Sequence, residues 1–382
     1  MKLMSLSPSK QKTGRLFFID FTRGIVMVLM AWDHVSGFWN RYHQGGEGVM
    51  GTARPFISTS WFLSRFITHY CAPTFIFLAG TVLALSTLKR IERGESGFRI
   101  SIRMIIRGVL LLVFEYLIVS PAFETGAYYF GVIACIGVCF MIFSIARKLP
   151  TSMIFGASLL TILNHSFLDL SFIPNYTWWG HYLRVIIHEP NFQWPPFTGL
   201  YPIIPWIGVM GLGWTFGQLL SGYDSEQIRY LERPLKITGI SALALFFIVR
   251  GMNGFGNLLP RNGVSLVDWL YVSKYPPSLS FLLWTLGGMC FMMALGLRLQ
   301  DRVNFERGIS GAIIIFGRTA LFFYLTHLWI YRLRLPGTPP LFYLPMTPTI
   351  GLWLIGLFVL YHLCSRYYLL KRRYPKSLLQ YI

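Results

Sequence analysis

Residues 15–35 read RLFFIDFTRGIVMVLMAWDHV, a stretch that is long and apolar enough to form a membrane-spanning helix. This stretch nevertheless carries Asp20 and Arg23 near one end and the pair Asp33 and His34 near the other. An ionised side chain at the centre of a spanning helix costs about 2.5–3.5 kcal/mol on insertion scales, so such groups pair, reach the interface or line a wet interior. The charged residues of this segment are therefore candidates for function.

The rest of the chain has the composition of an integral membrane protein. Hydrophobic residues make up 54% of the 382 residues and charged residues only 13%, and the mean hydropathy is +0.52. About 20 apolar residues cross a hydrocarbon layer ~30 Å thick as a helix. We predict an all-α protein of the cell (inner) membrane, with one multi-pass domain over residues 1–382. About ten transmembrane helices are expected, at 16–38, 66–88, 104–121, 127–146, 150–170, 199–221, 236–253, 277–298, 311–332 and 346–368.

The formal net charge of +19 is explained by orientation in the membrane. Basic residues gather in alternate loops, on the side that holds both termini, as the positive-inside rule describes for cytoplasmic loops. Both termini are therefore predicted to be cytoplasmic, and no nucleic-acid partner is needed to explain the charge. The polar N-terminal residues have no apolar core, so no removable signal peptide is expected. The residues that show the bias most clearly are Lys89, Arg90, Arg93, Arg99, Arg103, Lys371, Arg372 and Arg373.

The five cysteines lie in apolar stretches without the spacing of a disulfide framework or a metal site, so we interpret them as small hydrophobic residues. The three longer outward segments, 39–65, 171–198 and 254–276, carry several tryptophans. They fit either an interfacial aromatic belt or a lid that stacks on a sugar. The tryptophans are Trp39, Trp61, Trp178, Trp179, Trp194 and Trp269.

Helical geometry places the polar residues of the first span on a common face. Arg23 and His34 are eleven positions apart, which at about 100° per residue brings them within about 20° of each other and separates them by roughly 16 Å. Asp20 lies within about 60° of both, and Asp33 points to the side. The pattern predicts one water-filled passage, with Arg23 near its cytoplasmic end and His34 near its outer end. A packing ion pair between Asp20 and Arg23 and a hydrogen-bonded core histidine at position 34 remain alternatives.

Other spans add polar candidates. His69 is expected at a depth similar to that of His34, where it could also bond a neighbouring carbonyl group, and Glu115 could approach the same outer cluster. Arg318 and His327 are nine residues apart, on opposite faces of a continuous helix. They are therefore expected not to face one passage together unless the ninth span is wholly internal.

Five segments carry a resemblance to a known family: residues 15–35, RFITHYCAPTFIFLAGT (65–81), YPIIPWIGVMGLGWTFG (201–217), KYPPSLSFLLWTLG (274–287) and FGRTALFFYLTHLW (316–329). The chain resembles the bacterial multi-pass relatives of heparan-alpha-glucosaminide N-acetyltransferase. The pair Arg23 and His34 is also similar to the signature of the membrane acyltransferases that modify surface polysaccharides. The resemblance implies an acyl donor, acetyl-CoA, entering from the cytoplasm and an amino-sugar or other glycan acceptor on the outer side. The family has Asn in place of His34, and its catalytic His follows in the next outer loop, where His43 is a possible counterpart.

From these observations we expect a transmembrane acyltransferase that passes an acetyl group to an amine or hydroxyl of an extracytoplasmic glycan. A transporter or flippase using the same charges, and an assembly protein whose polar residues only join helices, remain alternatives. No metal is expected, and a homodimer is one candidate oligomeric state. The predicted site has His34, Asp33 and His69 as catalytic residues, Arg23, Asp20, Arg103, Arg107 and Arg318 for acetyl-CoA, and Glu115, Asn253, Lys274 and His327 for the acceptor.

Overall fold

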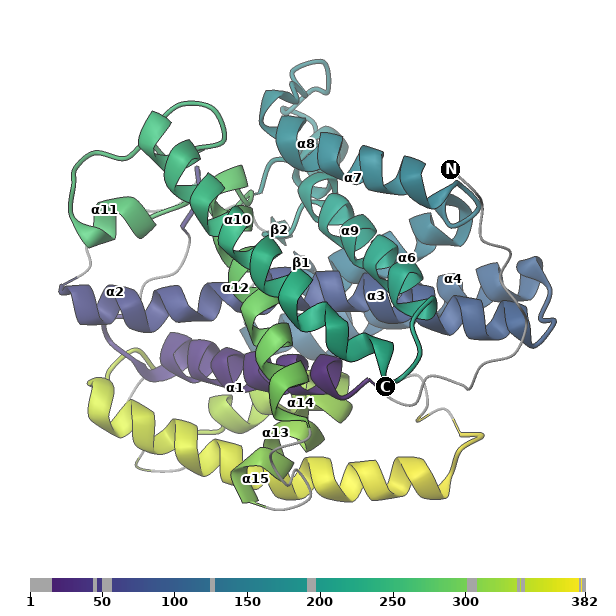
Figure 1. The fold of residues 1–382 in the computed structure, drawn as a ribbon. Helices are drawn as coiled ribbons and strands as arrows, with labels where there is room; N and C mark the ends of the chain where they lie inside the picture. The colour runs from purple at the N-terminus through teal and green to yellow at the C-terminus, as the bar shows by residue number, and fades with distance from the viewer. Residues whose placement is uncertain are drawn as a thin grey trace.

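The computed structural model describes residues 16–43, 47–49, 57–123, 128–190, 197–300, 308–334, 337, 341–377 and 379. In this part of the chain the fold is almost entirely helical, and each of the ten predicted stretches contains a helix (Figure 1). The α-helices are α1 (Phe17–Trp39), α2 (Thr59–Phe66), α3 (Cys71–Glu92), α4 (Gly97–Phe114), α5 (Ser120–Phe123), α6 (Val132–Ala146), α7 (Thr151–Asn164), α8 (Trp178–Ile187), α9 (Ile203–Ser221), α10 (Glu232–Met252), α11 (Leu266–Leu270), α12 (Leu279–Leu299), α13 (Gly308–Arg318), α14 (Ala320–Arg332) and α15 (Met346–Arg373).

The protein is a membrane protein by the length and composition of its helices. Among the described residues, five helical segments are long and apolar enough to cross a bilayer, and a bent pair of helices would make a sixth. The prediction of ten spans with both termini in the cytoplasm goes beyond this and stays a prediction. The five segments are Thr59–Glu92, Ile203–Ser221, Gln227–Met252, Leu279–Leu299 and Met346–Arg373, and the bent pair is α13 with α14.

Helix α1 occupies the centre of the bundle. It packs against α3, α12, α13, α14 and α15, and Figure 1 shows it between α3 and α15. Phe18, Val26, Met27 and Val35 are fully buried in this helix. A central helix has no lipid-facing side, so its charged residues must meet other parts of the protein, as their cost in hydrocarbon requires.

The predicted span 311–332 is not one straight helix. The chain breaks at Thr319, and α13 and α14 meet at an angle of 101°. Helix α13 crosses α1 so closely that a Cβ added at Gly317 would lie 1.8 Å from the carbonyl oxygen of Asp20. At the break, the Thr319 hydroxyl donates to the carbonyl of Ile315 at 2.8 Å and so satisfies a carbonyl at the end of α13.

The break corrects the sequence-based argument about Arg318 and His327. A continuous helix would place the two side chains on opposite faces, and the sharp bend removes that phase relation. Arg318 ends α13 and His327 lies inside α14, so the two side chains point into different parts of the protein. The expectation of one continuous helix through both residues is therefore wrong, whereas the two side chains, as expected, do not line a common cavity.

A short parallel pair of strands joins two distant segments near the end of α1. Strand β1 (Tyr128–Phe130) pairs with β2 (Phe197–Gly199), and Tyr129 lies opposite Thr198. Directly before α5, the backbone widens into a π-helical turn at Glu115–Val119. The strand pair places Tyr129 and Thr198 beside the same cavity, described next.

Candidate active site

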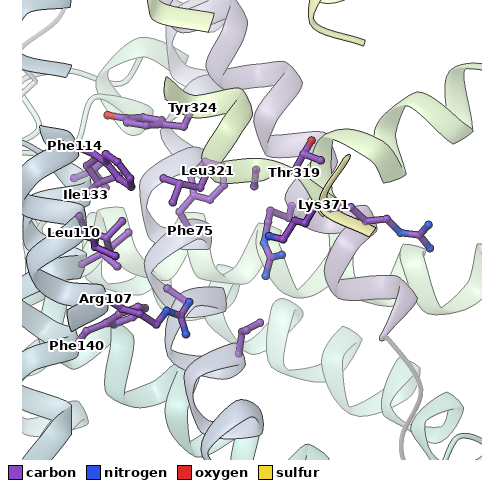
Figure 2. Close-up of a pocket in the computed structure, with 18 residues that line it drawn as sticks. Phe75, Arg107, Leu110, Phe114, Ile133, Phe140, Thr319, Leu321, Tyr324 and Lys371 are labelled. Atoms are coloured by element: carbon purple, nitrogen blue, oxygen red, sulfur yellow. The ribbon is translucent and has the colours of Figure 1, made fainter. Parts of the chain in front are cut away.

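The first of three adjoining cavities lies between α1, α3, α4, α6 and the junction of α13 with α14. We call it the Arg23 cavity; its volume is about 260 Å³. Figure 2 shows Tyr324 at one end of this cavity and Arg107 with Phe140 at the other, with Phe75 and Leu321 between them. The cations on its lining are Arg23, Arg107, Arg318 and Lys371.

The second cavity, the His34 cavity, lies beyond Tyr324 and has a volume of about 630 Å³. Its polar lining comes from distant segments, and the residues are Asp33, His34, His43, Arg65, Thr198, Lys274 and Arg332. Phe75, Val132 and Tyr324 line both this cavity and the Arg23 cavity. Instead of the one open passage expected from the sequence, two cavities meet at a partition formed by these three side chains.

The third cavity, the Arg103 cavity, extends the row from the opposite end of the Arg23 cavity. Its volume is about 460 Å³, and it shares Arg107 with the Arg23 cavity. Hydroxyl groups and cations line it: Ser86, Thr87, Arg90, Arg103, Arg107, Lys376 and Ser377. The carboxylate of Glu95, beside this cavity, pairs with Arg103 at 2.7 Å and with Arg90 at 2.8 Å, and hydrogen bonds from both hold the pKa of Glu95 below its usual value.

A chain of hydrogen bonds fixes the orientation of His34. Nδ1 of His34 lies 2.6 Å from Nε2 of His327, and Nδ1 of His327 lies 2.9 Å from the Phe323 carbonyl oxygen. Because a carbonyl only accepts, His327 must donate from Nδ1, which leaves its Nε2 as an acceptor when the ring is neutral. His34 then donates from its own Nδ1. In this tautomer Nε2 of His34 keeps a free lone pair and can act as a base.

Arg65, on the wall of the His34 cavity, joins two carboxylates. Its guanidinium pairs with Asp33, and it donates to both oxygens of Glu47, at 2.8 and 3.0 Å. The Thr68 hydroxyl also donates to Asp33, at 2.8 Å. Burial alone would raise the pKa of Glu47, but the adjacent Arg65 guanidinium outweighs burial and holds that pKa well below its usual range. The cluster fixes Asp33, and with it the end of α1 that carries His34.

Lys274 and His43 complete the polar wall. Lys274 is buried, with its ammonium 5.1 Å from the centre of the Tyr275 ring. His43 lies 3.0 Å from the Ser36 hydroxyl, and burial, with the positive charge of Arg65 adding to it, lowers the pKa of His43 to about 4. His43 is therefore neutral at physiological pH.

The lowered pKa of His43 predicts a dependence of stability on pH. The unfolded chain, in which histidine has a pKa of about 6.5, binds a proton before the folded protein does. We expect the contribution of His43 to be complete above about pH 6.5 and to be lost as the pH falls towards about 4. The measurement is the unfolding midpoint across this range. His43→Gln should flatten the curve, and an unchanged curve would contradict the assignment.

The predicted donor-binding residues gather around the Arg23 and Arg103 cavities. Asp20 is buried, with a carboxylate oxygen 3.7 Å from Nη1 of Arg23 and the other 3.5 Å from Nε of Arg318. Arg23 also donates to the Gly317 carbonyl at 3.2 Å. Asp20 therefore neutralises part of the positive charge beside the cavity. Arg107 lies 5.2 Å from the centre of the Phe140 ring and borders both cavities.

Several predicted residues lie away from the cavity lining. His69 lies 3.5 Å from Glu47, behind Arg65, and His327 is fully buried behind His34. Glu115 accepts from the backbone N–H of Ala134 at 2.8 Å, in the first turn of α6, where a helix N-terminus favours a carboxylate. Asn253 ends α10 and donates to the Arg261 carbonyl at 2.9 Å.

The tryptophans considered for a sugar lid do not line the His34 cavity where the structure describes them. Trp39 donates to the Tyr331 carbonyl at 2.5 Å, Trp178 and Trp179 are exposed, and Trp194 lies outside the described residues. The aromatic side chains that do line the cavity are Phe38, Phe75, Phe123, Tyr129, Tyr201, Tyr275, Tyr324 and Phe342. All five cysteines are free and buried.

Sequence analysis missed Arg65, Glu47 and Tyr324. Arg65 was assigned to an outer loop, but it lies at the end of α2, facing Asp33. The segment around Glu47 is rich in glycine and gives no periodic signal. Tyr324 lies three residues before His327. Residues at this spacing are neighbours on one face of a helix, so the sequence did contain a signal that both belong to the site.

The fold and cavities define a helical membrane protein with a row of basic and polar cavities around a central charged helix. The chain belongs to the family described as heparan-alpha-glucosaminide N-acetyltransferase, catalytic, whose sequence pattern matches residues 15–250. The match begins before α1 and ends in the last turn of α10. It includes Arg23, His34, Arg65 and Arg107, and it ends before Lys274, Tyr324 and His327. No curated protein matches the chain at a significant level.

Proposed function

We propose that the protein is an acetyltransferase of the cell (inner) membrane that moves an acetyl group from acetyl-CoA to an amine or hydroxyl of a glycan acceptor, with an amino sugar as the first candidate. The observation that carries the proposal is the order of the three cavities. Cations surround the Arg103 and Arg23 cavities, a partition follows, and a histidine with a free nitrogen lines the cavity beyond it. Membership of the family supports the reaction class.

The basic cavities suit the donor. The phosphate groups of CoA are anionic, and arginine forms strong charge-assisted hydrogen bonds with phosphate. Arg90, Arg103 and Lys376 offer positive charge around the Arg103 cavity, and Arg107 lies where this cavity meets the next one. The narrower Arg23 cavity can then take the pantetheine arm, with its thioester towards the partition.

The His34 cavity suits the acceptor. An amine or hydroxyl that enters it meets Nε2 of His34, which takes the proton as the acceptor attacks the thioester carbonyl carbon. A bond forms between the acceptor nitrogen or oxygen and the acetyl carbon, the carbon–sulfur bond breaks, and the CoA thiolate leaves. The proton held by His34 then neutralises the thiolate. Asp33 lines the same cavity and can accept a hydrogen bond from the acceptor.

The proposal is tested with purified protein in liposomes, acetyl-CoA labelled in its acetyl group, and glucosamine or glucosamine-bearing oligosaccharides as acceptors. We expect labelled acetyl groups on the acceptor and free CoA in equal amounts. Uptake of an unmodified substrate without acetyl transfer would instead support a carrier. Neither transfer nor uptake would favour a role in assembly.

Arg107 gives a prediction for donor binding. Because Arg107 borders both basic cavities, Arg107→Gln should remove one charge-assisted contact with the donor. Such a contact is worth about 1.5–3 kcal/mol, so the KM for acetyl-CoA should rise by roughly 10- to 100-fold while kcat changes little. Arg366→Gln, at an exposed position of α15, is the matched control. A normal KM in Arg107→Gln would contradict the proposed donor route.

A further inference from the structure

The partition between the Arg23 and His34 cavities contains one polar group, the hydroxyl of Tyr324. Phe75 and Val132, which share the partition, are apolar. Tyr324 is only 7% exposed, and its side chain lines both cavities. A tyrosine hydroxyl beside two cavities can donate a hydrogen bond to a molecule bound there. Figure 2 shows the ring at the end of the Arg23 cavity, near Phe114 and Ile133.

The position of Tyr324 matches a requirement of acyl transfer. On the proposed function, the donor thioester approaches the partition from one side and the acceptor from the other. The thioester carbonyl carbon must then lie at the partition when the new bond forms. Attack converts the carbonyl oxygen into an oxyanion, which needs a fixed hydrogen-bond donor in a water-poor site.

We infer that Tyr324 is a catalytic residue whose hydroxyl donates a hydrogen bond to the oxyanion of the tetrahedral intermediate. The inference rests on the proposed function and adds a residue that lies beyond the matched part of the chain. The Tyr324 ring centre lies 6.4 Å from that of His34, so the oxyanion donor and the base border the same cavity. His34 removes the proton from the acceptor while Tyr324 keeps its own and shares it with the oxyanion.

The rest of the partition explains why Tyr324 can hold this position. The ring also packs against His327, with 5.7 Å between ring centres, and His327 is hydrogen-bonded to His34. Tyr324 and His327 lie three residues apart on α14, so one helix positions both the oxyanion donor and the residue that orients the base. The sharp bend at Thr319 brings this helix across the end of the Arg23 cavity.

The test is Tyr324→Phe, which removes the hydroxyl and keeps the ring. Removal of one oxyanion donor typically lowers kcat by about 10²- to 10³-fold. We expect that loss in transfer from labelled acetyl-CoA to glucosamine. The dissociation constant for acetyl-CoA and the thermal unfolding midpoint should stay close to those of the wild type, because the hydrogen bond strengthens only as the oxyanion forms. Tyr331→Phe is the matched control, since Tyr331 lies on the same helix but donates to the Trp353 carbonyl, away from the cavities.

The outcomes separate this inference from the proposed function. A wild-type protein without acetyl transfer contradicts the proposed function itself. An active wild type with a Tyr324→Phe variant of equal kcat overturns only the role of Tyr324. A variant that loses acetyl-CoA binding in proportion to its activity also overturns it, because the hydroxyl would then act on the bound ground state.

A second variant covers the case in which Tyr324→Phe does not fold. Replacing Tyr324 with 3,5-difluorotyrosine keeps the size of the ring but makes the phenol ionise at a lower pH. Once ionised, the phenol can no longer donate, so kcat should fall with rising pH in this variant at a pH where the wild type is still active. Identical pH profiles for the two proteins would exclude hydrogen-bond donation by Tyr324.

Discussion

Replacing His34 with alanine is expected to reduce kcat for acetyl transfer by about 10²- to 10⁴-fold, the usual contribution of a positioned general base. The imidazole lines the His34 cavity, and its Nδ1 bond to His327 leaves Nε2 available to accept a proton. The KM for acetyl-CoA should change little, because the cations assigned to the donor lie on the other side of the partition. The measurement is steady-state transfer of labelled acetyl groups to glucosamine.

Chemical rescue distinguishes a lost base from a disturbed structure. His34→Ala leaves space in a cavity of about 630 Å³, so added imidazole should restore part of kcat, with a pH dependence that follows the imidazole. His362→Ala, at an exposed position of α15, is the control and should behave as the wild type with or without imidazole. A His34→Ala protein that keeps most of its activity would exclude His34 as the base.

The relation between Arg23 and His34 was predictable because both lie on one helix. Helical period alone predicts their common face, and the structure places each on the lining of one of two adjoining cavities. The partition was not predictable in the same way. Its members come from α3, α6 and α14, and their meeting depends on how those helices pack.

The Arg65 cluster shows a second limit of sequence reasoning. Asp33 was a candidate from its position in an apolar helix, but its partner Arg65 comes from another helix and Glu47 from a segment without periodicity. Ion pairs between side chains from distant segments leave no periodic pattern in the local sequence. The bend at Thr319 was missed for a related reason, since it depends on the close crossing of Gly317 over α1 and not on a proline or a polar run.

Arg65→Met is expected to lower the free energy of unfolding by about 3–5 kcal/mol, the largest stability effect we predict. The guanidinium is nearly fully buried between Asp33 and Glu47, and the side chain of Glu47 is only 3% exposed. Removing the cation leaves two carboxylates close together without a counter-charge, and their desolvation is then no longer offset. The measurement is denaturant-induced unfolding of the purified protein in detergent.

Two further variants test whether the loss of stability in Arg65→Met comes from uncompensated charge. Arg184→Met removes an ion pair with Glu189, whose side chain is 41% exposed, and should cost no more than about 1 kcal/mol. Adding Asp33→Asn and Glu47→Gln to Arg65→Met removes both unpaired charges and should recover much of the stability, because a buried ion cluster can be replaced by neutral groups at little cost. If the triple variant is as unstable as Arg65→Met alone, the effect comes from lost packing of the arginine side chain. The charge of Arg65 would then not be what holds Asp33 and the end of α1 beside the His34 cavity.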